Sequence, residues 1–121
     1  GGIKVIICKD RQQKLKKDNP SGGTGSLHCL YAIPKGEGFS GSSFSMIGTM
    51  TLEPGASIGA HLHENDEECF VILSGEGLYE ENDGTLHKVC AGDVTLTFRG
   101  ERHGLSNTGK DPLVFIAMIV Q

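Results

Sequence analysis

The sequence has no apolar run long enough to cross a membrane as a helix. Its longest run, Leu113–Val120, has eight residues, whereas a transmembrane helix needs about 18. The first residues also lack the apolar core of a secretory signal, because the charged residues Lys4 and Lys9 enclose only a short apolar stretch. These absences exclude a membrane partner and predict a soluble protein.

Cysteine pairs at metal-binding or redox spacing are missing as well. The four cysteines contain no CxxC arrangement, which excludes a zinc ribbon and a thioredoxin-type redox pair. They are Cys8, Cys29, Cys69 and Cys90. Reduced thiols are the default in the cytoplasm, so we expect a cytoplasmic protein.

Basic residues are in the minority, 11 against 15 acidic residues, for a net charge of −4. This balance argues against a nucleic-acid partner. Residues 1–20 nevertheless carry six basic and two acidic side chains, so this segment is +4 and the other 101 residues are −8. We expect a basic N-terminal arm that lies on its own acidic body or on a partner subunit, and a nucleic-acid-binding arm is the alternative.

The chain length of 121 residues fits one domain. The 18 glycines are about twice the usual share and indicate many tight turns between short elements, hence an all-β fold. We divide the chain into residues 1–26, an N-terminal strand or basic arm that ends in the flexible link Ser21–Ser26, and residues 27–121, a β-sandwich or barrel.

Alternation of apolar and polar residues locates individual strands. In the segment Phe44–Leu52, every second side chain from Phe44 is apolar apart from one glycine, which predicts a half-buried strand. The sequence Asn82–Gly84 predicts a tight hairpin turn. The final segment Leu113–Val120 is apolar throughout and predicts a strand covered on both faces. In total we expect about ten strands and no definite helix.

Three histidines and one carboxylate stand at spacings that suit a metal site. His61 and His63 are two residues apart, so on a strand both imidazoles project from one face. A polar turn then allows Glu68 to return beside them, and His103 joins them if a second hairpin closes across the first. Such a donor set suits one divalent first-row metal and leaves about two of six octahedral positions open.

These residues fit two spaced motifs, and through them the chain resembles the cupin superfamily. The first motif fits at Gly55, His61, His63, Glu68 and Gly75, and the second at Gly92, Gly100, His103 and Asn107. Phe98 stands where the second motif usually has proline, which leaves the local loop geometry open. The wider body is similar to small single-domain bacterial cupins of the oxalate-decarboxylase-like group.

The resemblance implies a jelly-roll β-barrel with His61, His63, Glu68 and His103 as metal ligands inside it. The implied cofactor is one divalent ion of Mn, Fe, Co, Ni, Cu or Zn. Oxalate decarboxylases carry an arginine three residues before the first motif histidine, and the matching residue here is Ile58. Oxalate decarboxylation is therefore not the favoured reaction.

The cupin fold alone does not fix a reaction, so several functions stay open. The first is a metal-dependent enzyme, of dioxygenase or decarboxylase type, that acts on a small chelating organic substrate. The alternative is a binding module without turnover, because no further Glu, His or Lys can be placed in the cavity. A sugar or sugar-phosphate isomerase comes third, since interior cations are not evident. No catalytic residue is assigned, and Tyr31 and Tyr79 are candidate proton donors.

Strand parity sorts the remaining residues. Phe70 and Ile72 share the parity of Glu68, and with Met46 and Met50 they are expected to form an apolar cavity wall. Of the residues outside the ligand set, His28 is a candidate cavity residue, and the others are expected at the surface: Glu67, Cys69, His87, Arg99, Glu101 and Arg102. The apolar last strand and the N-terminal arm suggest a homodimer.

Overall fold

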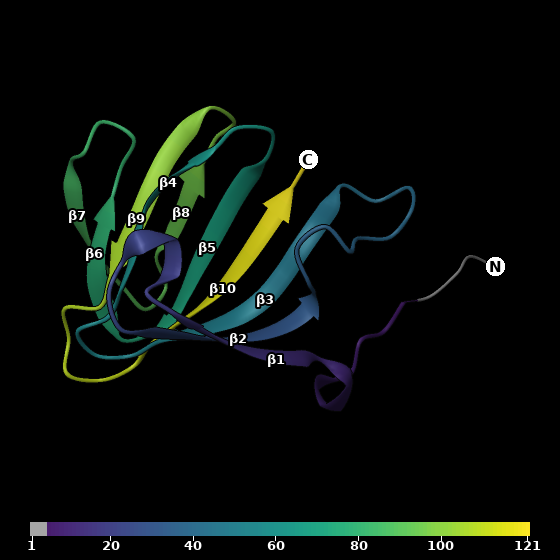
Figure 1. Cartoon of the computed structure of the whole chain (residues 1–121), viewed down its shortest axis with the longest axis horizontal. Helices are drawn as coiled ribbons and strands as arrows, with labels where there is room; N and C mark the ends of the chain where they lie inside the picture. The colour runs from purple at the N-terminus through teal and green to yellow at the C-terminus, as the bar shows by residue number, and fades with distance from the viewer. Residues whose placement is uncertain (1–4) are drawn as a thin grey trace.

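The computed structural model describes residues 5–121, which form ten strands in two antiparallel sheets (Figure 1). The six-stranded sheet has the order β1-β2-β3-β10-β5-β8, and the four-stranded sheet has the order β4-β9-β6-β7. The two helical segments are 3-10 turns of three residues, too short to cross a membrane. The elements are η1 (Lys9–Arg11), β1 (Gln13–Asp18), η2 (Pro20–Gly22), β2 (Ser26–Ile33), β3 (Phe44–Leu52), β4 (Ser57–His63), β5 (Glu67–Ser74), β6 (Glu76–Glu80), β7 (Leu86–Cys90), β8 (Val94–Thr97), β9 (Glu101–Ser106) and β10 (Leu113–Val120).

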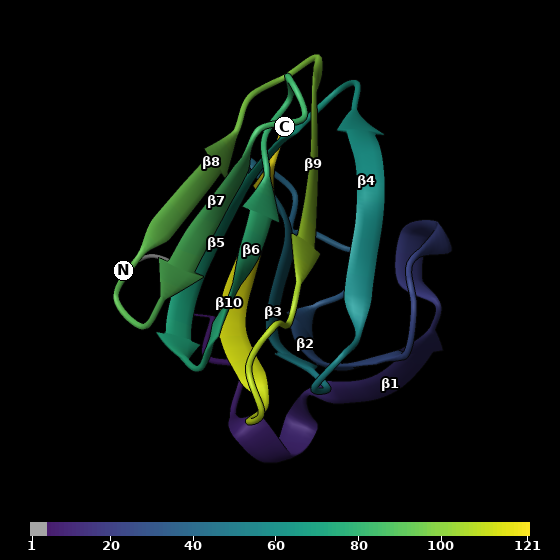
Figure 2. The same cartoon turned by 90° about the vertical axis from the view of Figure 1, so that its left-hand side faces the viewer.

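The two sheets face one another and enclose one core (Figure 2). Leu52, Leu113 and Phe115 are fully buried between them, and Ile72 and Leu105 are nearly so. The expected all-β jelly-roll barrel is confirmed. Its interior is formed by the inward-facing residues of both sheets, as in other packed β-sandwiches.

Two local predictions agree closely with the structure. The predicted strand Phe44–Leu52 is β3, and its alternate residues from Met46 onward are buried. The turn Asn82–Gly84 joins β6 to β7, with the Thr85 amide donating to the Asp83 carboxylate at 2.9 Å. Gly84 has a φ of 85°, which an L side chain rarely adopts.

The last strand differs from its prediction. Strand β10 has buried residues on its inner face only, whereas Val114, Ile116, Met118 and Val120 on the outer face are partly exposed. The prediction that both faces are covered is therefore wrong for the described chain. The strand lies in the middle of its sheet, between β3 and β5. Side chains of these neighbouring strands flank its outer residues, but no second layer formed by residues 5–121 covers them.

The N-terminal segment is joined to the barrel. Strand β1 pairs with β2 over six residue pairs, from Gln13 opposite Tyr31 to Asp18 opposite Ser26. Farther along, Thr24 bridges to Ser57 of β4 in the other sheet. The segment thus includes a strand that lies along the barrel, one of the two places expected for the N-terminal strand or arm; residues 1–4 lie outside the described part. All six β1 residues are exposed. The strand is held by backbone hydrogen bonds to β2, so its sequence shows no alternation of apolar and polar residues from which it could be predicted.

Candidate metal centre

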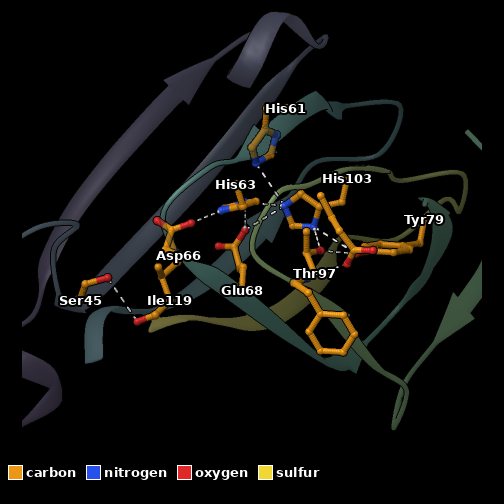
Figure 3. Close-up of polar contacts among 11 residues, drawn as sticks. Ser45, His61, His63, Asp66, Glu68, Tyr79, Thr97, His103 and Ile119 are labelled. Carbon is orange, nitrogen blue, oxygen red and sulfur yellow. Dashed lines mark hydrogen bonds and ion pairs between the residues drawn. The ribbon is translucent and has the colours of Figure 1, made fainter. Parts of the chain in front are cut away.

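The four predicted donors meet between the two sheets. His61 and His63 stand on β4, His103 on β9 and Glu68 on β5, and one ligand atom of each lies within 4.8 Å of all the others. Figure 3 shows the side chains pointing toward one another. His63, Glu68 and His103 are buried, and His61 is half-buried.

The strand pairing explains how residues 40 positions apart come together. His61 lies directly opposite His103 in the β4–β9 pair, and His63 follows on the same face of β4. The chain then turns over residues 64–66 and enters β5, where Glu68 faces inward across the gap between the sheets. The Gly100 amide donates to the His63 carbonyl at 2.7 Å and so holds the turn before β9 against the end of β4.

Each imidazole is oriented by a partner on its outer nitrogen. The Nδ1 of His61 donates to the Gly59 carbonyl at 2.8 Å, and the Nδ1 of His63 donates to the Asp66 carboxylate at 2.7 Å. Because these oxygens only accept, Nδ1 carries the proton in each neutral ring, and Nε2 is the nitrogen that faces the cluster, where it can bind a metal or, in a charged ring, donate to Glu68. Such outer contacts orient metal-binding histidines in other proteins.

The outer nitrogen of His103 belongs to a buried hydroxyl network. Its Nδ1 lies 2.7 Å from the Thr97 hydroxyl and 3.1 Å from the Tyr79 hydroxyl, and the two hydroxyls are 2.6 Å apart. His103 also stacks on the Phe70 ring, with the ring centroids 4.9 Å apart. This ring is therefore fixed by polar contacts at its outer nitrogen and by an aromatic face.

The inner atoms are close enough to require a positive charge among them. The Nε2 of His103 lies 2.9 Å from Nε2 of His63 and 3.1 Å from Nε2 of His61. Glu68 Oε1 lies 2.9 Å from the His103 Nε2 and 3.0 Å from the His63 Nε2. Lone pairs repel at such distances unless a proton or a metal ion lies between them. Three imidazoles and a carboxylate are donors that a divalent transition metal accepts.

The protonation of the cluster follows from its contacts. Burial raises the pKa of Glu68, but hydrogen bonds from His103 and His63 outweigh burial and bring the pKa to about 2. The hydrogen bond to Glu68 raises the pKa of His63, whereas burial lowers the pKa of His61. Glu68 is thus ionised at neutral pH, and His61 favours the neutral form that binds metals.

A cavity of about 430 Å³ opens from the cluster. His61, His63 and Glu68 line it, and His103 lies behind them at 1% exposure. Of the expected wall residues, the cavity is lined by Met46, Met50 and Phe70.

The expected place of Ile72 in this wall is wrong. Ile72 lies two residues farther along β5 than Phe70 and is buried, but it is not among the residues that line the cavity. Parity along a strand predicts the face of a residue but not its depth in the barrel, which is why the sequence could not exclude Ile72.

Several polar residues line the cavity that the sequence did not place there. They are Lys17, Lys35, Glu64, Asn65 and Asp66. No further Glu or Lys could be placed in the cavity from the sequence, and the structure adds Lys17, Lys35 and Glu64 as exposed residues of its lining. The argument against a sugar phosphate from missing cations is weakened accordingly. Lys17 was missed because β1 gives no hydrophobic signal. Asp66 was missed because a turn residue next to the ligands has no periodicity.

The remaining candidates lie outside the cavity. His28 pairs with Glu53 at 2.6 Å and His87 with Glu81 at 3.2 Å, both at the exposed surface. The Arg102 guanidinium donates to the Ala60 carbonyl at 3.1 Å. These contacts are structural and leave the cluster as the chemical centre of the described chain.

Two positions of the second motif have structural roles. The buried Asn107 amide donates to the carbonyls of Leu52 and Asp111, both at 2.9 Å, and so joins two loops. At Phe98, where the motif usually has proline, the backbone amide donates to the Glu101 carboxylate at 2.8 Å. The Glu101 side chain thus closes the turn before β9, and the His103 placement does not depend on proline.

Comparisons with known proteins agree with this geometry. The cupin domain family model matches residues 48–119. An oxalate-binding protein of Thermotoga maritima is 37% identical over 119 residues, covering 98% of this chain and 96% of that protein. A crystal structure of a predicted oxalate decarboxylase from Thermotoga maritima has a TM-score of 0.85 and 32% identity, covering 96% of this chain and 98% of that one.

A more distant structure shows the same fold. The polyketide cyclase RemF from Streptomyces resistomycificus has a TM-score of 0.74 at 18% identity, covering 98% of this chain and 80% of that one. The two motifs, the facing sheets and the family match lead to one conclusion. The chain belongs to the cupin domain family.

Proposed function

We propose that this protein holds a divalent transition metal with His61, His63, Glu68 and His103. The observation that carries the proposal is the approach of three Nε2 atoms and one carboxylate oxygen to within 4.8 Å, with the outer nitrogens of His61 and His63 bound to oxygens that only accept. Mn, Fe, Co, Ni, Cu and Zn all accept such donors. When bound, the metal supplies a Lewis acid with open coordination positions.

The ligand of this centre is, in our proposal, a small chelating carboxylate of the oxalate type. The 430 Å³ cavity has the size of a small-molecule site. The wall of Met46, Met50 and Phe70 excludes water from one side of the ligand and strengthens its electrostatic contacts. An oxalate-binding relative that matches 98% of this chain supports the same ligand class.

A second candidate is turnover of that ligand, by decarboxylase- or dioxygenase-type chemistry. The observation that favours it is Tyr31, which lines the cavity and carries a protonated hydroxyl at neutral pH. Incubation of the metal-loaded protein with oxalate under air, with measurement of CO₂ and O₂ consumption, distinguishes turnover from binding.

Elemental analysis tests the metal site. We expect near-stoichiometric metal in protein purified without added metal, or after reloading, and little in His61→Ala/His103→Ala. Calorimetry is then expected to show oxalate binding to the loaded protein and none to the metal-free protein. Failure of the parent to take up any of the six metals overturns the proposal.

We further propose a homodimer and a cytoplasmic location. The outer face of the six-stranded sheet carries partly exposed apolar residues along β10, and such faces favour association. The four cysteines are free thiols, which fits a reducing compartment.

A further inference from the structure

One side of the cavity carries a lysine from the edge strand β1. In the β1–β2 pair, Lys17 lies opposite Leu27, and Leu27 is buried and lines the cavity. Paired residues of neighbouring strands project from the same face, so Lys17 projects to the inside of the sheet. Lys14 and Lys16 project to the outside, where they border a groove with His28.

Tyr31 is the second polar group on this side. It is 6% exposed and lines the cavity, and its hydroxyl has the Cys29 thiol as a weak hydrogen-bond partner. A thiol is a weak hydrogen-bond partner, so a carboxylate oxygen in the cavity is a stronger acceptor for this hydroxyl. The Lys17 ammonium lies 5.9 Å from the centre of the Tyr31 ring, close enough for a cation–π contact that holds the two together.

Tyr31 and Lys17 suit the oxygens of a dicarboxylate that do not bind the metal. Oxalate that chelates a metal uses one oxygen of each carboxylate, and its other two oxygens point away from the metal. These oxygens need a hydrogen-bond donor and a positive charge. The apolar cavity residue Ile58 supplies neither.

We propose that Tyr31 and Lys17 form a subsite that selects a chelating dicarboxylate, with the Tyr31 hydroxyl donating to a distal carboxylate oxygen and Lys17 countering its charge. This inference rests on the proposed metal site and deepens it. It also gives β1 a function, because the strand delivers a cation that β2 and β3 do not provide. Lys35 adds positive charge at the same opening, and Glu64 opposes it.

Cobalt-loaded protein tests the subsite, because the visible spectrum of Co²⁺ reports both metal coordination and ligand binding. Oxalate and acetylacetone are titrated in parallel. Both chelate through two oxygens, but acetylacetone has methyl groups where oxalate has its distal oxygens. The ratio of their dissociation constants therefore reports the distal contacts and is insensitive to a general loosening of the site.

The variants are Tyr31→Phe and Lys17→Gln, with Lys14→Gln as the matched control on the opposite face of β1. We expect Tyr31→Phe to weaken oxalate about tenfold, as for loss of a hydrogen bond to a charged group, and to leave acetylacetone unchanged. We expect about a threefold loss for the exposed Lys17 and no change for Lys14→Gln. The ligand-free cobalt spectrum is expected to stay that of the parent.

Two results overturn the subsite, and they differ in what else they overturn. If the parent binds Co²⁺ and oxalate but both variants keep its oxalate-to-acetylacetone ratio, the subsite is wrong and the metal site stands. If the parent takes up no Co²⁺, the metal site and the subsite fall together.

Discussion

Three of the four clustered donors, His61, His63 and His103, stand on two adjacent strands of the four-stranded sheet. The six-stranded sheet contributes only Glu68 and, instead of further donors, most of the apolar wall. Its inward residues on β3 and β10 include Met46, Met50, Phe115, Ala117 and Ile119. One sheet thus carries the coordination chemistry, and the other sets the volume and polarity of the cavity.

This division makes the two sheets separable by mutation. The histidines of β4 are oriented by residues near them in the chain, His61 by Gly59 and His63 by Asp66. His103 of β9 is fixed instead by Thr97 and Phe70 of the six-stranded sheet. The wall residues are held by burial between sheets, which depends on many neighbours. Changes at the donors and at the residues that orient them should therefore alter metal affinity, and changes in the apolar wall of the six-stranded sheet should alter stability and ligand choice.

The largest effect is expected from removing two donors of the four-stranded sheet. His61→Ala/His103→Ala should lower metal affinity by more than about 100-fold. Replacing a residue that only orients a ligand already costs about 10- to 100-fold, and this variant removes two ligands. Elemental analysis after dialysis measures it. The exposed pair His28→Ala/His87→Ala is the control and should keep the metal. Equal metal content in both double variants would contradict the assignment.

A core substitution in the six-stranded sheet should lower stability and leave metal content unchanged. Phe115 is fully buried and lines the cavity, so Phe115→Ala should lower the free energy of unfolding by about 3–5 kcal/mol. Metal content measured in the cold should stay that of the parent. The exposed Phe44→Ala is the control and should change stability by less than about 0.5 kcal/mol. Loss of metal from folded Phe115→Ala would show that the sheets are not separable.

A middle-sized effect is expected at Asp66. Asp66→Asn removes the charge that holds the His63 ring through a 2.7 Å contact, and should weaken metal binding about tenfold. Competition with a chromophoric chelator measures the affinity. The exposed neighbour Glu64→Gln loses the same charge without contacting the ring, so it should retain the parent's affinity. An unchanged affinity in Asp66→Asn would deny it a positioning role.

The sequence was sufficient where the local pattern and the tertiary contact coincide. The His-x-His spacing on β4 fixes one face for both rings, and the polar turn before Glu68 reverses the chain within a few residues. His103 needed the fold resemblance, because only barrel closure brings β9 beside β4. The hairpin at Asn82–Gly84 was predictable because its turn residues carry their own conformational preference.

The sequence was insufficient where pairing or depth decides the structure. The β1 residues are all exposed, so nothing in their hydrophobicity distinguishes an edge strand from a solvated arm. Ile72 has the right parity but does not line the cavity, because alternation along a strand does not tell where along the barrel a side chain lies. Asp66 reaches the cavity from a turn and Lys17 from an edge strand, and in neither place does the alternation of apolar and polar residues predict where a side chain points.

The stability of the metal-free protein should depend on pH through Glu68, which links the six-stranded sheet to the histidines of the four-stranded sheet. Burial and the outweighing hydrogen bonds from His103 and His63 bring its pKa from 4.5 to about 2. A carboxyl with a lowered folded-state pKa adds stability above pH 4.5 that is lost as the pH falls to about 2. Near pH 6.5 the raised pKa of His63 and the lowered pKa of His61 act in opposite directions. Urea unfolding between pH 2 and 5 should show the free energy of unfolding falling with pH. In Glu68→Gln this dependence on pH should be weaker.

Glu67→Gln is the matched control for this profile. Glu67 precedes Glu68 on β5 and has the opposite parity. The acid limb should persist in this variant. A parent whose stability is flat between pH 2 and 5 would contradict the charge assigned to Glu68.

The smallest effect on the metal centre is expected from the outer face of the six-stranded sheet. Met118 of β10 lies opposite Cys69 of β5, which lies opposite Leu96 of β8, so an apolar band crosses three strands on the side away from the cavity. Leu96→Lys should leave metal content unchanged and shift the protein from dimer to monomer in sedimentation.

Leu86→Lys places the same charge on the four-stranded sheet at nearly the same exposure, 56% against 58%. It should keep the dimer, because Leu86 lies on β7, outside the band. A parent that sediments as a monomer at micromolar concentration would exclude the dimer. Dissociation by Leu86→Lys alone would instead assign the interface to the sheet that carries the histidines, and the division between a chemical sheet and a supporting sheet would no longer extend to assembly.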